Sequence, residues 1–411
     1  MSHFQRRVAL FKNQAFTAYV LGQLFSAIGN GLGYIAMSWV VISKHNSVSA
    51  MAILMACFWG PSVFLGPLMG VLADRLSRKW IITISNACRA IIFIAFSFYL
   101  ITHFHVSTVY ALMLCIGISF SAFFSSVFAF MRELVAENNL MHAYVTIDIV
   151  YEIGNLAGMG LAGFLIAWTS PETVILMNGL TFLIAVLLMF FVPKAALCHG
   201  GPRTKQKIKV LQDFRDGLNY LAQNKKLIGV YTIQLLIFIT YLSAPLLLLP
   251  FSQTILHASA KQFGMIEASA SLGIVIGGLI VPWVSEQLGL FRTLMIFCSV
   301  LFLTFLYFGY NHSIPLAAIM YFMIGFSGAV WPLIITRAQS LTTLDFQGRV
   351  QSTFNSLSGA AMLIFYFGIG SVGKYIGVEH LYFAEVIIIT VAIVLMIKMR
   401  GAFSEKIEAS V

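Results

Sequence analysis

The sequence predicts an all-α membrane protein with twelve transmembrane helices arranged as two six-helix halves. Apolar residues make up 59% of the 411 residues and charged residues only 10%, whereas an ordinary soluble protein is about one quarter charged. The mean hydropathy is +0.90. A water-soluble globule could not cover this much apolar surface, so lipid is the expected solvent over most of the chain.

Twelve apolar segments account for this composition. Each is long enough to cross roughly 30 Å of hydrocarbon as a helix. The predicted spans are residues 15–41, 49–73, 80–102, 106–131, 143–168, 172–192, 227–251, 261–284, 291–310, 313–337, 349–373 and 380–398.

The basic residues alternate with these spans. With both termini placed in the cytoplasm, 21 of the 25 Lys and Arg residues lie in inner segments and three in outer loops, and Arg89 lies inside a span. This bias favours an even number of spans and two cytoplasmic termini. The net charge of +10 is therefore interpreted as a topology signal and not as a nucleic-acid-binding surface.

The predicted spans divide the chain into three regions. Residues 1–192 form the first six-helix half, 193–226 a cytoplasmic linker, and 227–411 the second half. Within the linker, Ile208–Leu221 places apolar residues on one helical face, which predicts an amphipathic helix at the membrane surface. The first apolar run is too long for a signal-peptide core, so we expect it to be retained as a span.

The two halves repeat each other at a nearly constant offset. Asp74 at the end of span two corresponds to Glu286 at the end of span eight, 212 residues later, and glycine runs in spans five and eleven are 210 residues apart. Two unrelated features with nearly the same offset indicate a duplicated six-span unit, and such repeats are typical of transporters.

The glycine runs match the dinucleotide pattern GxGxxG, but both lie inside apolar spans and neither follows a strand. Glycines at this spacing let helices approach closely in lipid. We therefore predict helix packing for Gly154, Gly158, Gly160, Gly163, Gly368, Gly370 and Gly373.

The most informative local motif is the turn between spans two and three. Gly70 permits close helix contact, and Asp74 can pair with a base or cap a helix N-terminus. Arg75, Arg78 and Lys79 can bind acidic groups. We predict that these charges form a conformational latch, made in one state of an alternating-access carrier and broken in the other; three bases that only fix orientation are the simpler alternative.

This turn resembles the signature of the major facilitator superfamily, G-x-L-x-D-R-x-G-R-R/K, with Ser77 in place of the usual glycine. Five further segments resemble the macrolide-efflux and enterobactin-exporter branch of that superfamily. They are Glu133–Ala143 with Gly154–Gly163, Asn178–Phe182, Asp216–Leu221, and Gly348–Val350.

The resemblance covers essentially the whole chain and implies a secondary carrier in the bacterial inner membrane. Such carriers usually work as single chains and export a bulky amphipathic compound or a siderophore in exchange for protons. Three positions depart from many proton-coupled relatives: Asn30 replaces an Asp, Met159 follows Gly158 where a proline is common, and span four lacks an arginine. Proton coupling is thus implied by kinship alone.

Acidic residues inside the spans are candidates for proton coupling, because a charge at mid-bilayer costs about 3 kcal/mol. Asp148 and Glu152 lie one turn apart on one face of span five, and clustered carboxylates favour binding of a proton. Glu267 lies in span eight. Glu385, near the outer end of span twelve, is expected to reach towards water instead.

Other polar and aromatic residues in the spans are candidate substrate or ion-pair residues. Arg89 in span three can pair with a buried carboxylate or bind an anionic group of the substrate. Asn30, Tyr34, Tyr151 and Trp331 can line an amphipathic cavity, although aromatic residues in lipid are more often packing or interface anchors.

Several function classes find no support in the sequence. The histidines and cysteines show no metal-ligand spacing, no phosphate loop occurs, and no nucleophile constellation points to an enzyme. We therefore expect a transporter without metal or cofactor, with a small-molecule substrate, protons and the lipid bilayer as partners. An importer with the same fold is the alternative, because the sequence does not set the direction of transport.

Overall fold

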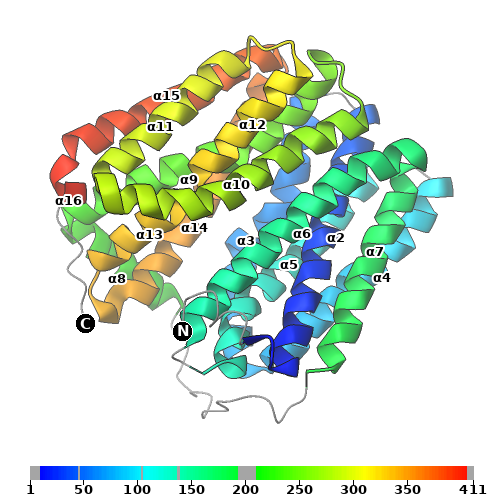
Figure 1. Cartoon of the computed structure of the whole chain (residues 1–411), viewed down its shortest axis with the longest axis horizontal. Helices are drawn as coiled ribbons and strands as arrows, with labels where there is room; N and C mark the ends of the chain where they lie inside the picture. Colours follow the sequence, from blue (N-terminus) through cyan, green and yellow to red (C-terminus); the bar gives the residue numbers. More distant parts are fainter. Residues whose placement is uncertain (1–9, 45–46, 103–104, 137–138, 193–209, 405–411) are drawn as a thin grey trace. The chain divides into compact units, whose positions relative to one another are not determined.

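The computed structural model describes residues 10–44, 47–102, 105–136, 139–192 and 210–404, and the regular elements of these residues are all helices (Figure 1). Twelve of the described helices are long and apolar enough to cross a membrane. The predicted fold class, an all-α protein with twelve transmembrane helices, is confirmed.

Seven helices cover the first half of the chain and the segment after it. In chain order they are α2 (Gln14–Lys44), α3 (Val48–Arg75), α4 (Arg78–Thr102), α5 (Val106–Leu134), α6 (Leu140–Trp168), α7 (Pro171–Phe190) and α8 (Val210–Gln223).

Eight helices follow in the second half of the chain. They are α9 (Lys225–Thr254), α10 (Ala260–Leu288), α11 (Leu290–Phe308), α12 (Ile314–Gly328), α13 (Trp331–Ser340), α14 (Leu344–Val372), α15 (Val378–Lys398) and α16 (Arg400–Ser404).

Helix ends follow from local chemistry. Ser170 caps α7 by accepting a hydrogen bond from the backbone N–H of Thr173, with Pro171 at the first helical position. Asn224 caps α9 in the same way through the N–H of Leu227, at 3.1 Å. Gly289, with φ of +81°, makes the tight turn between α10 and α11, a backbone conformation that costs least for glycine.

The tenth span differs from the expected single helix because it is interrupted between Gly328 and Trp331. Pro332 has no backbone N–H, and its ring clashes with the carbonyl group four residues earlier, which belongs to Gly328. The helix therefore stops after Gly328 and restarts as α13, with Pro332 in its first turn.

The described helices form two compact units. Unit 1 contains α2, α3 from Cys57 onward, α4 to α7, and Ser259–Ala268 at the start of α10. Unit 2 contains α3 up to Ala56, α8, α9, and all of the chain from Ser269 onward. Each unit thus takes one short helical segment from the opposite half of the sequence.

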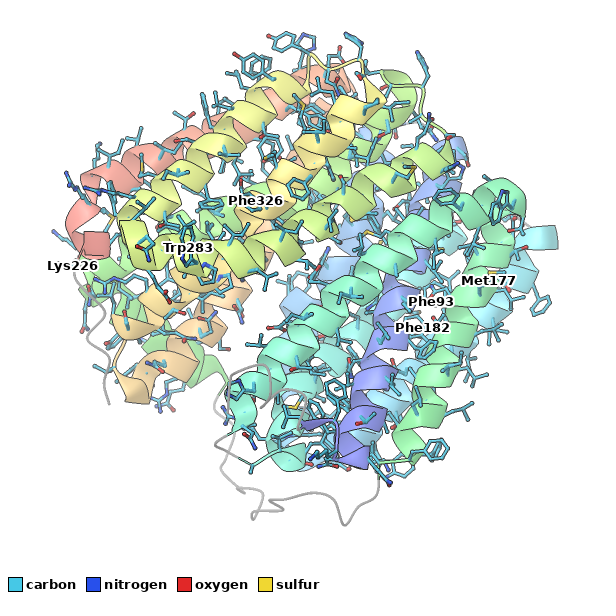
Figure 2. All side chains as sticks on the ribbon, viewed as in Figure 1. Phe93, Met177, Phe182, Lys226, Trp283 and Phe326 are labelled. Atoms are coloured by element: carbon cyan, nitrogen blue, oxygen red, sulfur yellow. The ribbon has the colours of Figure 1, made fainter. Side chains whose placement is uncertain are left out.

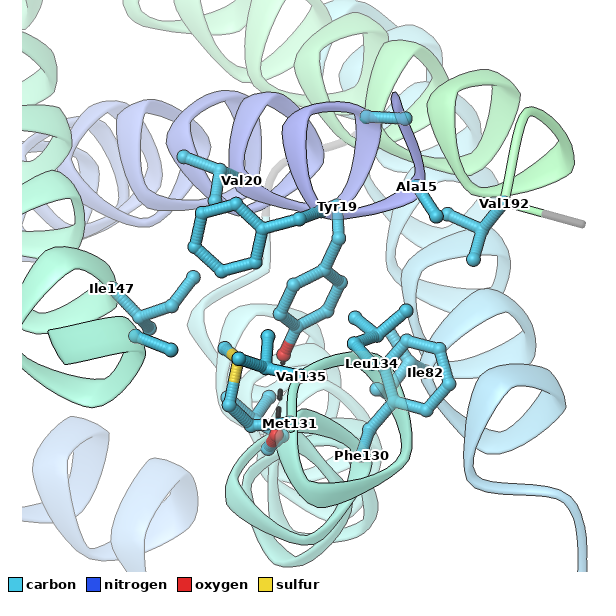
Figure 3. Close-up of a cluster of buried hydrophobic side chains, with 14 of the residues drawn as sticks. Ala15, Tyr19, Val20, Ile82, Phe130, Met131, Leu134, Val135, Ile147 and Val192 are labelled. Carbon is cyan, nitrogen blue, oxygen red and sulfur yellow. Dashed lines mark hydrogen bonds between the residues drawn. The ribbon is translucent and has the colours of Figure 1, made fainter. Parts of the chain in front are cut away.

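A cluster of buried apolar side chains joins α2, α4, α5 and α6 in unit 1 (Figure 3). Tyr19 lies within it, edge-to-face with Phe130 at a centroid distance of 5.2 Å. Its hydroxyl donates a hydrogen bond to the carbonyl oxygen of Val127 at 3.2 Å. Buried hydroxyl groups need such a partner, so the bond fixes how α2 packs on α5.

The distribution of polarity is that of a protein surrounded by lipid. Large apolar side chains such as Ile91, Ile364 and Trp283 are more than 60% exposed. Figure 2 draws the side chains on the ribbon, with Trp283 labelled. In contrast, Arg89 and Glu385 are completely buried. Charged groups that lie at membrane depth in a helical protein normally face the interior in this way.

Helix α8 lies against α14 in unit 2. The ring of Tyr220 stacks on that of Phe346 at 4.6 Å, and Asp216 forms an ion pair with Arg349 at 3.9 Å. Gly217 leaves no room for a side chain beside Thr353. The described part of the predicted amphipathic helix therefore packs one face on the beginning of α14.

Candidate functional site

The turn between α3 and α4 is held to the rest of unit 1 by two basic residues. Arg78 donates a hydrogen bond to Glu133 at the end of α5, at 2.9 Å, with both side chains largely buried. The Lys79 ammonium group donates to the carbonyl oxygen of Val192, just after α7. The turn thus ties three helices together.

For three residues of the predicted latch, the structure does not describe the contacts. The side chains of Asp74 and Arg75, and the surroundings of Gly70, lie outside the described part of the structure. The latch therefore stays a prediction at these positions. Its described component is the Arg78–Glu133 pair, whose acidic member the sequence did not single out as a partner.

Arg89 is the centre of a buried polar cluster in unit 1. Its guanidinium group donates to the amide oxygen of Asn86 at 2.6 Å and to that of Asn30 at 3.3 Å. The charge also lies over the rings of Phe123 and Phe182, 4.4 and 4.5 Å from their centroids. Cation–π contacts of this kind are strongest where water is absent.

The partners of Arg89 differ from the carboxylate that was one expectation. Among the described residues, no Asp or Glu oxygen lies within 4.0 Å of the guanidinium group. Amide oxygens and ring faces solvate the charge without neutralising it. Because isolated charges are costly in a low-dielectric interior, this cation retains a capacity to attract an anion.

The tyrosine of α6 extends this cluster. Tyr151 lies close to Asn30, Asn155 and Arg89. The structure therefore brings together Arg89, Asn30 and Tyr151, three of the predicted substrate or ion-pair residues. Asn86 was missed, although its position one helical turn before Arg89 was a usable signal.

Two of the predicted proton-coupling residues lie next to each other on α6. Asp148 and Glu152 are one turn apart and interact electrostatically. The Asp148 side chain is exposed, whereas that of Glu152 is half-buried. Among the described residues neither forms an ion pair with a Lys, Arg or His residue.

The third proton-coupling candidate lies in the segment that α10 contributes to unit 1. Glu267 is buried, and it accepts a hydrogen bond from the Tyr34 hydroxyl of α2 at 2.8 Å. One helical turn before Glu267, the ring centroid of Phe263 lies 6.4 Å from that of Trp39. Tyr34, predicted as a substrate contact, is thus the partner of a buried carboxylate.

Trp331 and Glu385 complete the predicted set in unit 2. The ring of Trp331 stacks on that of Phe238 in α9, with 5.2 Å between the ring centroids. This contact is helix packing. Glu385 is completely buried and hydrogen-bonded to Ser243. Our expectation that it reaches towards water is wrong, because its face of α15 packs against α9 and α11.

The glycines of α6 differ in how much space a side chain would find beside them. A methyl group at Gly154 or Gly158 would overlap the backbone or side chains of α2, and one at Gly163 would overlap the backbone at Ala260 and Lys261. Gly160 has ordinary van der Waals room, with Ala268 at 3.7 Å. The close contacts bring α6 against α2 and against the start of α10.

The glycines of α14 behave in a related way within unit 2. Gly370 and Gly373 face Ala52 and Val48 at the start of α3, and Ser49 donates a hydrogen bond to the carbonyl oxygen of Gly370. Gly368 is different: among the described residues nothing lies within 4 Å of a methyl group placed there. The packing prediction for Gly368 is therefore not met.

An unpredicted glycine run on α2 also shapes unit 1. Methyl groups at Gly29 and Gly33 would overlap Asn178 of α7, and one at Gly31 would overlap the backbone of α6. Asn178 is completely buried, and its amide has no hydrogen-bond partner among the described residues. Three glycines at alternate positions were the signal that sequence reasoning left unused.

Twelve described helices that are long and apolar enough to cross a membrane, with buried charged side chains between them, define a multi-pass membrane protein. The family model of the Major Facilitator Superfamily matches residues 19–366. The chain belongs to this superfamily.

Curated relatives are transporters of the same type. The chain is 26% identical over 390 residues, 90% of its length and 89% of the relative's, to YfiS of Bacillus subtilis (strain 168), an uncharacterized MFS-type transporter. It is 22% identical to the multidrug efflux pump Tap of Mycolicibacterium fortuitum, covering 82% of this chain and 85% of that one. It is 26% identical to the enterobactin exporter EntS of Salmonella choleraesuis (strain SC-B67), covering 64% and 63%.

Solved structures show the same fold. A single-residue mutant of the nucleoside transporter NupG matches with a TM-score of 0.76 at 14% identity, over 95% of this chain and all of that one. A bacterial homologue of the iron transporter ferroportin matches with a TM-score of 0.71 at 16% identity, over 94% of this chain and 98% of that one.

Proposed function

We propose that this chain is a proton-coupled carrier that exports an amphipathic small molecule, a drug-like compound or a siderophore, across the bacterial inner membrane. Tap and EntS, a multidrug efflux pump and an enterobactin exporter, support the direction and the substrate class. We further propose that both termini lie in the cytoplasm and that the active carrier is a monomer.

The observation that carries proton coupling is the Tyr34–Glu267 pair. A buried carboxylate in a membrane protein is expensive unless it is paired or binds a proton. Among the described residues, its hydrogen bond comes from a phenol and not from a Lys or Arg residue. A group held in this way is suited to bind and release a proton, because no Lys or Arg side chain among the described residues forms an ion pair with it.

The partners of this pair come from opposite halves of the sequence. Tyr34 lies on the first span and Glu267 on the eighth. A change in their hydrogen bond therefore acts on two helices that alternating access has to move. Glu152, with Asp148 beside it, is the second candidate for the same role, in accordance with its half-buried position on α6.

The Arg89 cluster supports an anionic group in the substrate. The guanidinium group has amide oxygens but, among the described residues, no carboxylate around it. An anion would supply the missing countercharge, and Asn30 and Tyr151 would orient it through hydrogen bonds. Arg89 is completely buried here, so this contact requires a state of the carrier in which the cluster is open.

The latch would work in the same cycle. Arg78 and Glu133 form an ion pair at 2.9 Å between the α3–α4 turn and the end of α5, where a change of state could make or break it. We propose that Gly70, Asp74 and Arg75 complete this latch on the cytoplasmic side and that it is broken when the carrier changes state.

Everted membrane vesicles test the function directly. Labelled candidate substrates should accumulate in the vesicles when an inward-acidic pH gradient is imposed, and the gradient should be consumed. Glu267→Gln should abolish uphill accumulation while leaving exchange between two substrate pools intact. Glu286→Gln is the matched control, because it changes an exposed carboxylate at the other end of the same helix.

Two results would contradict the proposal. Accumulation that is unchanged when the pH gradient is collapsed would exclude proton coupling. Wild-type accumulation in both Glu267→Gln and Glu152→Gln would exclude these carboxylates. Uptake that occurs only in right-side-out vesicles would instead support import, the alternative direction for the same fold.

A further inference from the structure

Glu385 is a buried acidic residue in unit 2 that the proposed function does not use. It lies on α15, is completely buried, and contacts Ser243 of α9 through Oε1 at 2.6 Å. Its second oxygen, Oε2, is buried and has no hydrogen-bond partner among the described residues. A carboxyl group in this position needs an explanation, because ionised carboxylates without partners are costly to bury.

The hydroxyl group of Ser243 limits which protonation state fits. This hydroxyl lies 2.7 Å from the carbonyl oxygen of Ile239, one turn earlier on α9, and 2.6 Å from Glu385 Oε1. A serine hydroxyl has one hydrogen to donate. If Glu385 is ionised, Ser243 can donate its hydrogen to only one of these two oxygens, and the other short contact then brings two acceptor oxygens together with no hydrogen between them.

A protonated Glu385 removes this conflict. Its own O–H donates to the Ser243 oxygen, and Ser243 donates to the Ile239 carbonyl oxygen, a bond that serines in helices commonly make. Both short distances are then hydrogen bonds. Oε2 then becomes the carbonyl oxygen of a neutral acid. Burying such an oxygen without a hydrogen-bond partner costs much less free energy than burying an unpaired carboxylate oxygen.

Among the described residues, no Lys or Arg side chain of the helices around Glu385 forms an ion pair with it. Helix α9 contributes Ser243, and α14 contributes Tyr366, which interacts electrostatically with Glu385 and donates its own hydrogen bond to the carbonyl oxygen of Leu242 at 2.9 Å. The titratable groups of α11 are Arg292, Cys298 and Tyr307. Among the described residues, none of these forms an ion pair or hydrogen bond with Glu385.

We infer that Glu385 is a proton-binding site of the second half of the chain, occupied in this structure. The site is built from Glu385 and Ser243, with Tyr366 as its neighbour, and its ligand is a single proton held between α15 and α9. It is separate from Glu152, Asp148 and Glu267, and it does not depend on the substrate or the direction of transport.

The backbone of α9 suits such a site. Pro245, two residues after Ser243, has no N–H to donate to the carbonyl group of Tyr241. A helix that lacks one of its hydrogen bonds bends more easily at that point. Movement of α9 away from α15 would therefore be the step that exposes Glu385 to water and lets its proton exchange.

Infrared spectroscopy of the full-length protein in lipid nanodiscs tests the site. A protonated carboxyl group gives a carbonyl stretching band that a carboxylate does not. We expect a band at neutral pH that is lost in Glu385→Gln and kept in Glu286→Gln, which changes an exposed carboxylate. A spectrum in which Glu385→Gln removes no such band would overturn the inference.

A second variant covers the case in which Glu385→Gln fails to fold. Ser243→Ala keeps the acid but removes the acceptor of its hydrogen bond, so we expect the same band to persist and to shift to a higher frequency. An unshifted band would show that Glu385 does not donate to Ser243 and would refute the site. Both readouts are independent of transport, so they can fail or succeed whatever the vesicle assay gives.

Discussion

Gly158 and Gly368 occupy corresponding positions in the two halves of the chain, but their surroundings differ. A methyl group at Gly158 would lie 3.0 Å from the carbonyl carbon of Ile28 and 3.1 Å from the Cα atom of Gly31, and it would overlap the Ile28 carbonyl oxygen. At Gly368, nothing among the described residues lies within 4 Å. Substituting each glycine with alanine therefore isolates the effect of helix contact.

The magnitude follows from two opposing effects. Alanine in place of glycine favours a helix by about 1 kcal/mol at either position. At Gly158, α2 and α6 would also have to separate by roughly 1 Å, and overpacking of this kind costs about 1–3 kcal/mol. We therefore expect Gly158→Ala to be less stable than Gly368→Ala by about 1–3 kcal/mol, because the propensity gain is common to both.

The assay is thermal unfolding of the purified variants in one detergent, followed by tryptophan fluorescence. For a chain of 411 residues, a difference of this size corresponds to a gap between the two melting temperatures of about 1–3 °C. Gly368→Ala should melt at or slightly above the wild type. Melting temperatures that agree within about 0.5 °C for the two variants would refute the argument that α2 and α6 need a glycine at their contact.

Three further predictions rest on described contacts. Arg89→Lys should lower the melting temperature by several degrees, because a lysine cannot replace a planar guanidinium group that bonds two amides and lies on two rings; an unchanged melting temperature would contradict this. A double-mutant cycle of Arg78→Ala and Glu133→Ala should give a coupling of about 1 kcal/mol for this largely buried pair, whereas additive effects would show that the pair contributes nothing. Hydrogen bonds with the side chain and backbone of Thr343 lower the pKa of the Tyr220 phenol below its usual value. The folded state is then stabilised as pH rises through that lowered pKa, fully so above about pH 10, so the stability difference between wild type and Tyr220→Phe should grow with alkaline pH, and a constant difference would refute it.

The sequence predicted the spans well because the bilayer imposes their length and composition. Apolar runs and the alternation of basic residues depend on lipid and charge, and not on which helices touch. Breaks within a span were harder to predict. Pro332 is evident in the sequence, but a proline in a span can bend the helix, break it or leave it intact, depending on its neighbours. The interruption after Gly328 was therefore not predicted.

The site residues could be predicted as types but not as partners. Glu267, Arg89 and Tyr34 stand out because polar groups are rare in these spans. Their partners depend on which sides of the helices pack together. The Tyr34–Glu267 bond joins residues far apart in the chain, so no local sequence pattern predicted it. Glu385 was misplaced for the same reason, since its depth in the span was known and its face was not.

The exchange of short segments between the two units has a consequence for biosynthesis. The chain emerges in order, but the first unit needs Ser259–Ala268, which a ribosome makes only after the first seven spans. Until then, the surface around Gly163 that α10 later covers lies open to lipid or to insertion factors. A half-chain ending near residue 192 would keep this gap permanently, so the protein is expected to mature late and as a whole, and separately expressed halves are expected to require each other to become stable.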